Sequence, residues 1–287
     1  MKILAIGDFH GKFPGKLKKL VKNEKIDFIF STGDFGGSDK LLKIIFKYFY
    51  ENWWERVGEK KARKLIKDDY NSGKKIINEL NNMKVPVYTV HGNWDFEDRT
   101  YKRRSAGFNI GKYSDIIKKK KNIVFLKKRI KNVKNLKVYG FGGFVVASVY
   151  LTNDGGFDKK QRDKYKKEHE KQKKQLFKKA RKDIDILLAH YPPYGFFDKV
   201  KFKGQNPMNG KHVGFKPYLE FIKKFKPKLF ICGHMHEYQG KKKIGDTLVV
   251  TTGSAKQGKA AVIEIASSKS KDFEASKIEK IKVKFVR

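Results

Sequence analysis

The sequence predicts an α/β fold in which ligand-bearing loops gather at the carboxyl edge of a sheet. Five short apolar runs, rich in β-branched residues, each end in a turn that carries Asp, Asn or His. Glycine directly precedes the polar residue in four of these turns. Ligands of open α/β sheets bind outside the carboxyl ends of the strands. We therefore expect the five turns to meet at the same edge of one sheet.

The N-terminal third predicts a β-α-β unit followed by helices. The strand, helix and strand of that unit are expected at residues 2–7, 15–23 and 26–31. A helix should begin at the N-cap Ser38 and carry an aromatic run as far as Trp54. A second helix is expected over 59–82, with a candidate break at 71–73. The aromatic run indicates helix packing, with base stacking as the alternative.

The rest of the chain alternates strands with basic segments. Strands are expected at residues 85–90, 123–126, 136–139, 184–189, 229–232, 247–252, 260–265 and 281–286, the last at a sheet edge. A further helix is expected at 216–225. We expect one domain over residues 1–287, with a helical insertion at about 38–82 and basic insertions at about 96–122 and 158–182. The last insertion is interpreted either as a solvated surface helix or as an arm that binds along a row of phosphates.

Composition limits the class of protein. The 287 residues contain 68 Lys and Arg against 30 Asp and Glu, a formal net charge of +38. Such an excess makes nucleic acid a plausible partner through counterion release, although biased composition is an alternative. No apolar run approaches the roughly 18 residues of a membrane span, and no signal peptide is expected. The lone cysteine, Cys232, forms no internal disulfide, so we expect a cytoplasmic protein.

The polar residues in the five turns form a set that suits two divalent metal ions. The candidate ligands are Asp8, His10, Asp34, Asn93, His190, His234 and His236. Imidazole combined with carboxylate favours Mn, Fe, Zn, Co or Ni over calcium. The glycines that precede the ligands, at positions 7, 33, 92 and 233, are expected to provide positive φ or close backbone approach.

The five turns together resemble the motifs of the calcineurin-like metallophosphoesterase superfamily, in particular its prokaryotic phosphodiesterase-type branch. The matching segments are Gly7-Asp8-Phe9-His10-Gly11, Gly33-Asp34-Phe35-Gly36-Gly37, Gly92-Asn93-Trp94-Asp95, His190-Tyr191-Pro192-Pro193 and Gly233-His234-Met235-His236. The resemblance covers nearly the whole chain. It implies a four-layer α/β/β/α sandwich with a dinuclear metal site at the carboxyl edge of the strands.

The resemblance also implies roles for the ligands. Asp34 would bridge the two ions, and with Asn93 it would count among the catalytic residues. The first ion would take Asp8, His10 and His236, and the second would take Asn93, His190 and His234. Manganese is the first expectation for the metal. A water shared by two such ions ionises near neutrality and attacks phosphorus in line.

The implied activity is a divalent-metal-dependent phosphoesterase. A phosphodiesterase that acts on nucleic acid or nucleotides through a metal-bridging hydroxide is the favoured form. The alternatives are a small-molecule phosphodiester or phosphomonoester hydrolase, and a non-catalytic scaffold with the same fold.

Trp94 departs from the family pattern. Many members of the superfamily have at this position a histidine that protonates the leaving group or binds phosphate, and an indole cannot transfer that proton. Three explanations stay open: a good leaving group, stacking of Trp94 on an aromatic leaving group, or replacement of the acid by another residue. The candidates for such a replacement are His91, Asp95 and His212.

Overall fold

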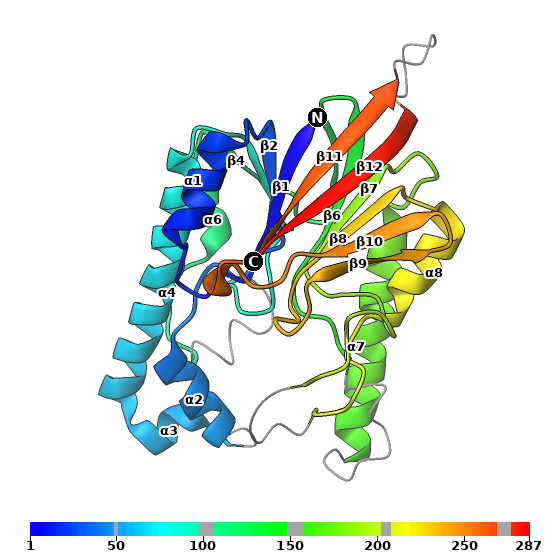
Figure 1. Ribbon diagram of the computed structural model, residues 1–287. Helices are drawn as coiled ribbons and strands as arrows, with labels where there is room; N and C mark the ends of the chain where they lie inside the picture. The colour runs from blue at the N-terminus through cyan, green and yellow to red at the C-terminus, as the bar shows by residue number, and fades with distance from the viewer. Residues whose placement is uncertain (49–50, 98–105, 148–157, 202–207, 269–276) are drawn as a thin grey trace.

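The computed structural model describes residues 1–48, 51–97, 106–147, 158–201, 208–268 and 277–287. Two six-stranded sheets pack face to face, and helices cover the outer face of each (Figure 1). Three apolar clusters fill the spaces between these four layers. The predicted α/β/β/α sandwich is therefore confirmed. Residues 98–105 of the first predicted basic insertion, and Phe49 and Tyr50 of the aromatic run, lie outside the described residues.

The first sheet has the strand order β12-β11-β1-β2-β3-β4. Its parallel strands are β1 (Lys2–Ile6), β2 (Phe28–Ser31), β3 (Val87–Thr89) and β4 (Ile123–Phe125). The antiparallel strands at its edge are β11 (Ala260–Ser268) and β12 (Lys277–Val286). The helices over its outer face are α1 (Gly15–Asn23), α4 (Glu59–Asn82) and α6 (Tyr113–Ile117).

The second sheet has the order β5-β6-β7-β8-β10-β9. Its parallel strands are β6 (Leu136–Phe141), β7 (Ile186–Ala189), β8 (Leu229–Cys232) and β10 (Thr247–Thr251). The antiparallel edge strands are β5 (Ile130–Val133) and β9 (Gly240–Ile244). The helices on its outer face are α7 (Lys159–Lys178) and α8 (Lys216–Phe225). A short 3₁₀ turn, Ala255–Gln257, follows β10.

The expectation that the five ligand turns share one sheet is wrong. Three of the turns follow β1, β2 and β3 of the first sheet, and two follow β7 and β8 of the second. The sheets pack through buried residues such as Phe28 and Ile186. The loops nevertheless meet, because the backbone N–H of His234, after β8, lies 3.0 Å from both carboxylate oxygens of Asp8, after β1.

The aromatic run is divided between two helices. Helix α2 (Asp39–Lys47) begins as predicted at Ser38, whose hydroxyl accepts the backbone N–H of Leu41. It ends at Lys47, and Trp53 and Trp54 belong to a separate short helix, α3 (Trp53–Val57). Trp53 is only 2% exposed and packs edge-to-face against Trp54. Trp53 therefore contributes to packing in the first apolar cluster.

Helix α4 runs without the break considered at 71–73. Gly73 is buried in its middle, where an added Cβ would lie 2.0 Å from the hydroxyl oxygen of Tyr113. The glycine is needed for close contact with α6 and does not end the helix. Among the described residues, no helix has both the length and the apolar character needed to cross a membrane.

Candidate metal centre

Four of the predicted ligands have left-handed backbone conformations. The φ angles of Asp8, His10, Asp34 and His234 are 55°, 42°, 56° and 67°. A non-glycine residue in this region costs of order 1–3 kcal/mol and is often found at functional sites. The sharp turns after β1, β2 and β8 thus direct these side chains toward one another at an energetic cost that the fold must offset.

The glycines beside the ligands are needed for space, as predicted. Gly33 has a φ of 91°. A Cβ at Gly92 would lie 2.0 Å from Oδ1 of Asp34, and a Cβ at Gly233 would lie 2.3 Å from Oδ2 of Asp8. Any side chain at these two positions would displace the carboxylates.

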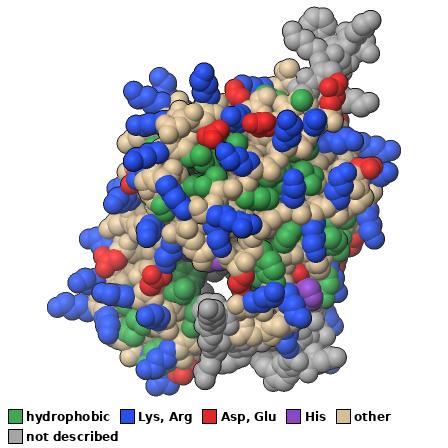
Figure 2. Space-filling model, in the orientation of Figure 1, with side chains coloured by type: hydrophobic (Ala, Val, Ile, Leu, Met, Phe, Trp, Pro, Cys, Tyr) green, Lys and Arg blue, Asp and Glu red, His purple; other side chains and the backbone are tan. Residues whose placement is uncertain are grey.

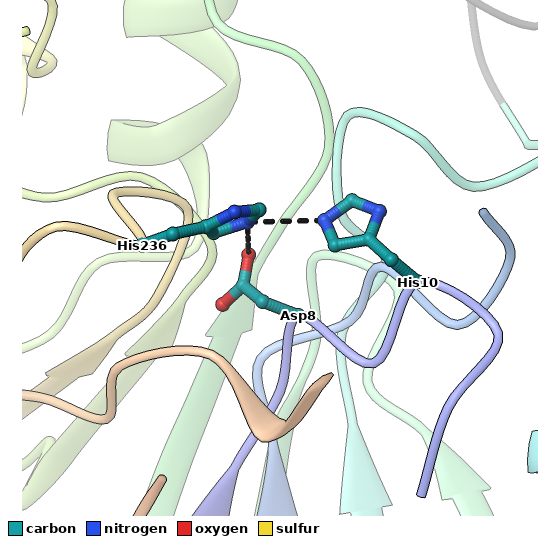
Figure 3. Close-up of side chains that lie close together, drawn as sticks. All are labelled: Asp8, His10 and His236. Carbon is teal, nitrogen blue, oxygen red and sulfur yellow. Dashed lines mark hydrogen bonds and ion pairs between the residues drawn. The ribbon is translucent and has the colours of Figure 1, made fainter. Parts of the chain in front are cut away.

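The first group of ligands contains Asp8, His10 and His236 (Figure 3). The Nε2 atoms of His10 and His236 are 3.0 Å apart, and Nε2 of His236 is 3.3 Å from Oδ1 of Asp8. Figure 3 shows a ring nitrogen of His10 directed at a ring nitrogen of His236, with the carboxylate of Asp8 beside His236. Three donor atoms from the β1 and β8 loops are therefore close enough to hold one ion.

The second group is centred on Asn93. Its Oδ1 lies 2.7 Å from Nε2 of His190 and 2.8 Å from Nδ1 of His234. The carbonyl oxygen of Thr32 accepts the Nδ1–H of His190 at 2.8 Å, which leaves a lone pair on Nε2. His190 and Asn93 then direct lone pairs at each other, and a cation placed beside both atoms would satisfy them.

Asp34 lies between the two groups. Its Oδ2 is 3.6 Å from Nε2 of His10 and 3.5 Å from Nε2 of His190. Its Oδ1 accepts the backbone N–H of Trp94 at 2.7 Å. One carboxylate oxygen is thus held by the backbone, while the other lies within 3.6 Å of a histidine from each group. All seven predicted ligands are brought together.

Burial favours the neutral form of two of the candidate ligand histidines, His190 and His234. It lowers the pKa of His190, and it lowers that of His234 well below the usual value, with His190 adding a smaller effect. Metal ligation requires neutral imidazole, so protons do not compete for these nitrogens near pH 7. Burial acts in the same direction on His236, but the hydrogen bond and charge of Asp8, together with the charge of Asp34, outweigh this and raise the pKa of His236. The mixed imidazole, carboxylate and amide donor set fits divalent transition metals.

Hydrogen bonds to the side chain of Asp95 hold two of the ligand loops together. Its carboxylate accepts the backbone N–H groups of Asp34, Phe35 and Gly92 at 2.8–2.9 Å. Burial, followed by the neighbouring Asp34 charge, raises the pKa of Asp95 to about 7. We propose that Asp95 positions the loops, because its side chain is buried and its carboxylate already accepts three backbone N–H groups.

The side chain of Trp94 packs beside the first group of ligands. Its indole N–H donates to Oδ1 of the fully buried Asp69 in α4, at 3.2 Å. The indole ring packs edge-on to the ring of His10, with centroids 6.4 Å apart. Trp94 therefore forms a wall next to His10, and its one polar hydrogen is directed at Asp69.

The two remaining candidate acids lie in different surroundings. His91 is buried and packs against Phe125 at 5.5 Å between ring centroids. Nδ1 of His212 is 2.6 Å from Oδ1 of Asp198, a buried carboxylate that also accepts two backbone N–H groups of its own loop. The His212 side chain is 40% exposed. These contacts hold His212 beside Asp198 and do not bring it into either ligand group.

Tyr191 was not singled out by the sequence analysis. Its ring stacks on that of His234, with centroids 3.7 Å apart and an angle of 28° between the planes, and it also packs edge-on to His190. Neighbours of this kind fix the orientation of ligand rings. Its position next to His190 in the sequence was the only available signal, and it does not reveal contact with His234.

Replacing Asp95 with Asn should destabilise the metal-free protein. The side-chain NH₂ of Asn would face a backbone N–H that now donates to the carboxylate of Asp95. A buried donor that is left without an acceptor costs about 1–3 kcal/mol. Urea unfolding should show a loss of this size. Asp246→Asn, at an exposed turn between β9 and β10, should change the unfolding free energy by less than about 0.5 kcal/mol. Equal losses of unfolding free energy in both variants would show that Asp95 does not hold the loops together.

Replacing Tyr191 with Leu should weaken metal binding while Tyr191→Phe preserves it. Phenylalanine retains the ring that orients His234, whereas leucine does not. Residues that support ligands typically change metal affinity by about 10–100-fold. Competition with a chromogenic chelator measures this affinity without any turnover. Equal weakening by Phe and Leu would show that the hydroxyl matters and not the stack.

Comparison with known proteins agrees with this geometry. The family model for calcineurin-like phosphoesterases matches residues 1–238. No curated protein matches the chain. One crystal structure is 19% identical, covers 99% of this chain and 98% of its own, and superposes with a TM-score of 0.61. TT1561 of Thermus thermophilus is 18% identical over 91% of this chain and 92% of its own, with a TM-score of 0.50.

At these identities the two structures show a shared fold. The family match is broader evidence, because it spans the ligand turns after β1, β2, β3, β7 and β8. The chain therefore belongs to the calcineurin-like phosphoesterase family and is a hydrolase of phosphoric esters.

Proposed function

We propose that the protein is a divalent-metal-dependent phosphodiesterase that acts on nucleic acid or nucleotides. The observation that supports it most is the position of Asp34 Oδ2, 3.6 Å from His10 and 3.5 Å from His190. Separate donors lie on each side of this oxygen, as a pair of ions with one shared carboxylate requires.

We propose manganese as the metal, with Fe, Zn, Ni and Co as chemically compatible alternatives. Two bound ions would lower the pKa of a shared water and neutralise charge on the phosphoryl oxygens. The chain itself holds the donor atoms. Asp34 is oriented through Trp94 N–H, and His190 through the carbonyl of Thr32.

The exposure of the ligands indicates the side from which a substrate approaches. The His190 side chain is completely buried, whereas those of His10 and His236 are 16% and 38% exposed. A phosphoester would therefore approach over His10 and His236, beside the wall formed by Trp94. That wall would be the first protein surface to meet the leaving group.

The net charge of +38 supports a polyanionic substrate. A small-molecule phosphodiester or phosphomonoester remains the alternative within the same reaction class. A non-catalytic scaffold is less favoured, because the donors of both predicted ion sites converge and burial favours neutral His190 and His234.

Hydrolysis of bis-p-nitrophenyl phosphate and p-nitrophenyl phosphate by metal-stripped protein tests the proposal. Added Mn²⁺ should restore activity, and the diester should be turned over faster. Asp34→Asn should lose nearly all activity together with bound metal, because a neutral amide is a poor bridge between two cations. The exposed Asp246→Asn should retain both. Metal-bound protein without any turnover would support the scaffold.

Replacing Trp94 with His should improve turnover of substrates that have poor leaving groups. An imidazole at this place can protonate the departing oxygen, and general acids typically contribute about 10²–10⁴-fold. The gain should be larger for alkyl than for p-nitrophenyl esters, when kcat is compared across leaving groups. Trp94→Phe, which adds no proton donor, should not show this difference. An equal effect of His and Phe would show that the position does not face the leaving group.

A further inference from the structure

The overall charge does not by itself identify a binding surface. On the face shown in Figure 2, Lys and Arg side chains are scattered widely and outnumber Asp and Glu. A polyanion-binding surface must therefore be identified by a regular arrangement of positive charges. Helix α7 has such an arrangement.

Six lysines form a continuous row along α7, here called the lysine stripe. Its members are Lys160, Lys164, Lys167, Lys171, Lys174 and Lys178. The spacing alternates between four and three residues, which places all six on one face of a helix. All are exposed, and the three acidic residues of the helix lie outside the row. The stripe is about 27 Å long at the helical rise per residue.

The opposite face of α7 is fixed to the protein. Leu176 is fully buried, and His169 packs edge-on to Phe215 at 5.3 Å between ring centroids. Gln172 donates to the carbonyl of Phe144 and accepts the N–H of Val146. Helical periodicity puts this anchored face across the axis from the stripe. The lysines therefore point outward from a helix that is held in place.

We propose that the lysine stripe binds the phosphates of a nucleic-acid strand without reading its sequence. This rests on the proposed function only in taking nucleic acid as the substrate. A strand carries phosphates about every 3.4 Å along a duplex axis, so each ammonium in the row finds a partner. Phosphate contacts position a strand but do not specify bases.

The packing of α7 favours a strand along its exposed face over a membrane surface or a DNA major groove. Membrane-surface helices insert an apolar face into lipid, but the apolar face of α7 packs on the protein. An isolated helix could enter a DNA major groove about 12 Å wide, whereas one face of α7 is covered by its own protein. A strand lying along the exposed face meets neither obstacle.

The stripe begins on the side of the molecule that holds the metal centre. The N-terminal half of α7 extends past the carboxyl ends of the second sheet's strands (Figure 1). The segment held by Gln172 follows Gly143, whose N–H donates to the carbonyl of His91 at 2.7 Å. His91 directly precedes the loop of Asn93. The segment that anchors α7 is therefore hydrogen-bonded to the chain next to a ligand loop. A strand bound on α7 would thus lie on a helix that is connected to the metal centre.

Fluorescence anisotropy with a labelled single-stranded DNA 20-mer tests the stripe on metal-free protein, in which turnover plays no part. The variant replaces Lys164, Lys167, Lys171 and Lys174 with Gln. The matched control replaces Lys60, Lys64, Lys67 and Lys74 of α4, which are also exposed and lie on the other side of the molecule. Both variants lose four charges.

The stripe variant should bind at least about tenfold more weakly, and its slope of log K against log salt should fall by about 3. The α4 control should change much less, and a second DNA sequence should bind equally well. Equal losses in the two variants, or no DNA binding, would overturn the proposal. Preference for anionic vesicles over DNA would assign the stripe to a membrane surface.

Hydrolysis of bis-p-nitrophenyl phosphate separates this inference from the proposed function. The stripe variant should keep wild-type turnover of this small diester, because none of its four lysines belongs to the metal centre. Loss of DNA binding with intact turnover supports the stripe. DNA binding that depends on the stripe, in a protein that hydrolyses no diester, would support the stripe and reject the phosphodiesterase.

Discussion

The metal centre depends on the hydrogen bonds that join the loops after β2 and β3. Asp34 accepts the N–H of Trp94, while Asp95 accepts the N–H groups of Asp34 and Gly92. Each loop thus supplies both donors and acceptors to the other. If either loop moved, Asp34 would lose its place between the two groups of ligands.

This arrangement concentrates negative charge in a buried space. Asp8, Asp34 and Asp95 are each no more than 2% exposed. Isolated buried carboxylates are costly unless cations or hydrogen bonds compensate them. Burial, and after it the charge of Asp34, raises the pKa of Asp95. Divalent ions would compensate this negative charge, so the carboxylates that repel one another would favour metal binding.

The candidate ligands could be predicted from the sequence because each motif is local. Asp8 and His10 lie within one turn, and the apolar run before them identifies the strand. The family resemblance implied two sheets, but the assignment of each strand to one of them could not be predicted in the same way, since a buried strand carries no label for its neighbour. The edge strand β9 was missed because Lys241, Lys242 and Lys243 give it neither alternation nor apolar character.

Contacts between distant segments were also beyond the sequence. Asp69 lies in the middle of α4, and no local pattern connects it with the indole of Trp94. The stack of Tyr191 on His234 likewise joins loops after β7 and β8. The helical segment at 38–82, expected as an insertion, therefore contributes to the surroundings of the metal centre through Asp69.

The lysine stripe must also be reconciled with helix stability. Like charges at these spacings destabilise a helix by about 0.2–0.5 kcal/mol per pair, so α7 would be weak if it were isolated. Its capping box at Asp158 and the buried Leu176 oppose that repulsion. The helix can then present a charged row that it could not maintain alone. A bound polyanion would remove the repulsion, so the arrangement that opposes helix formation also favours the proposed partner.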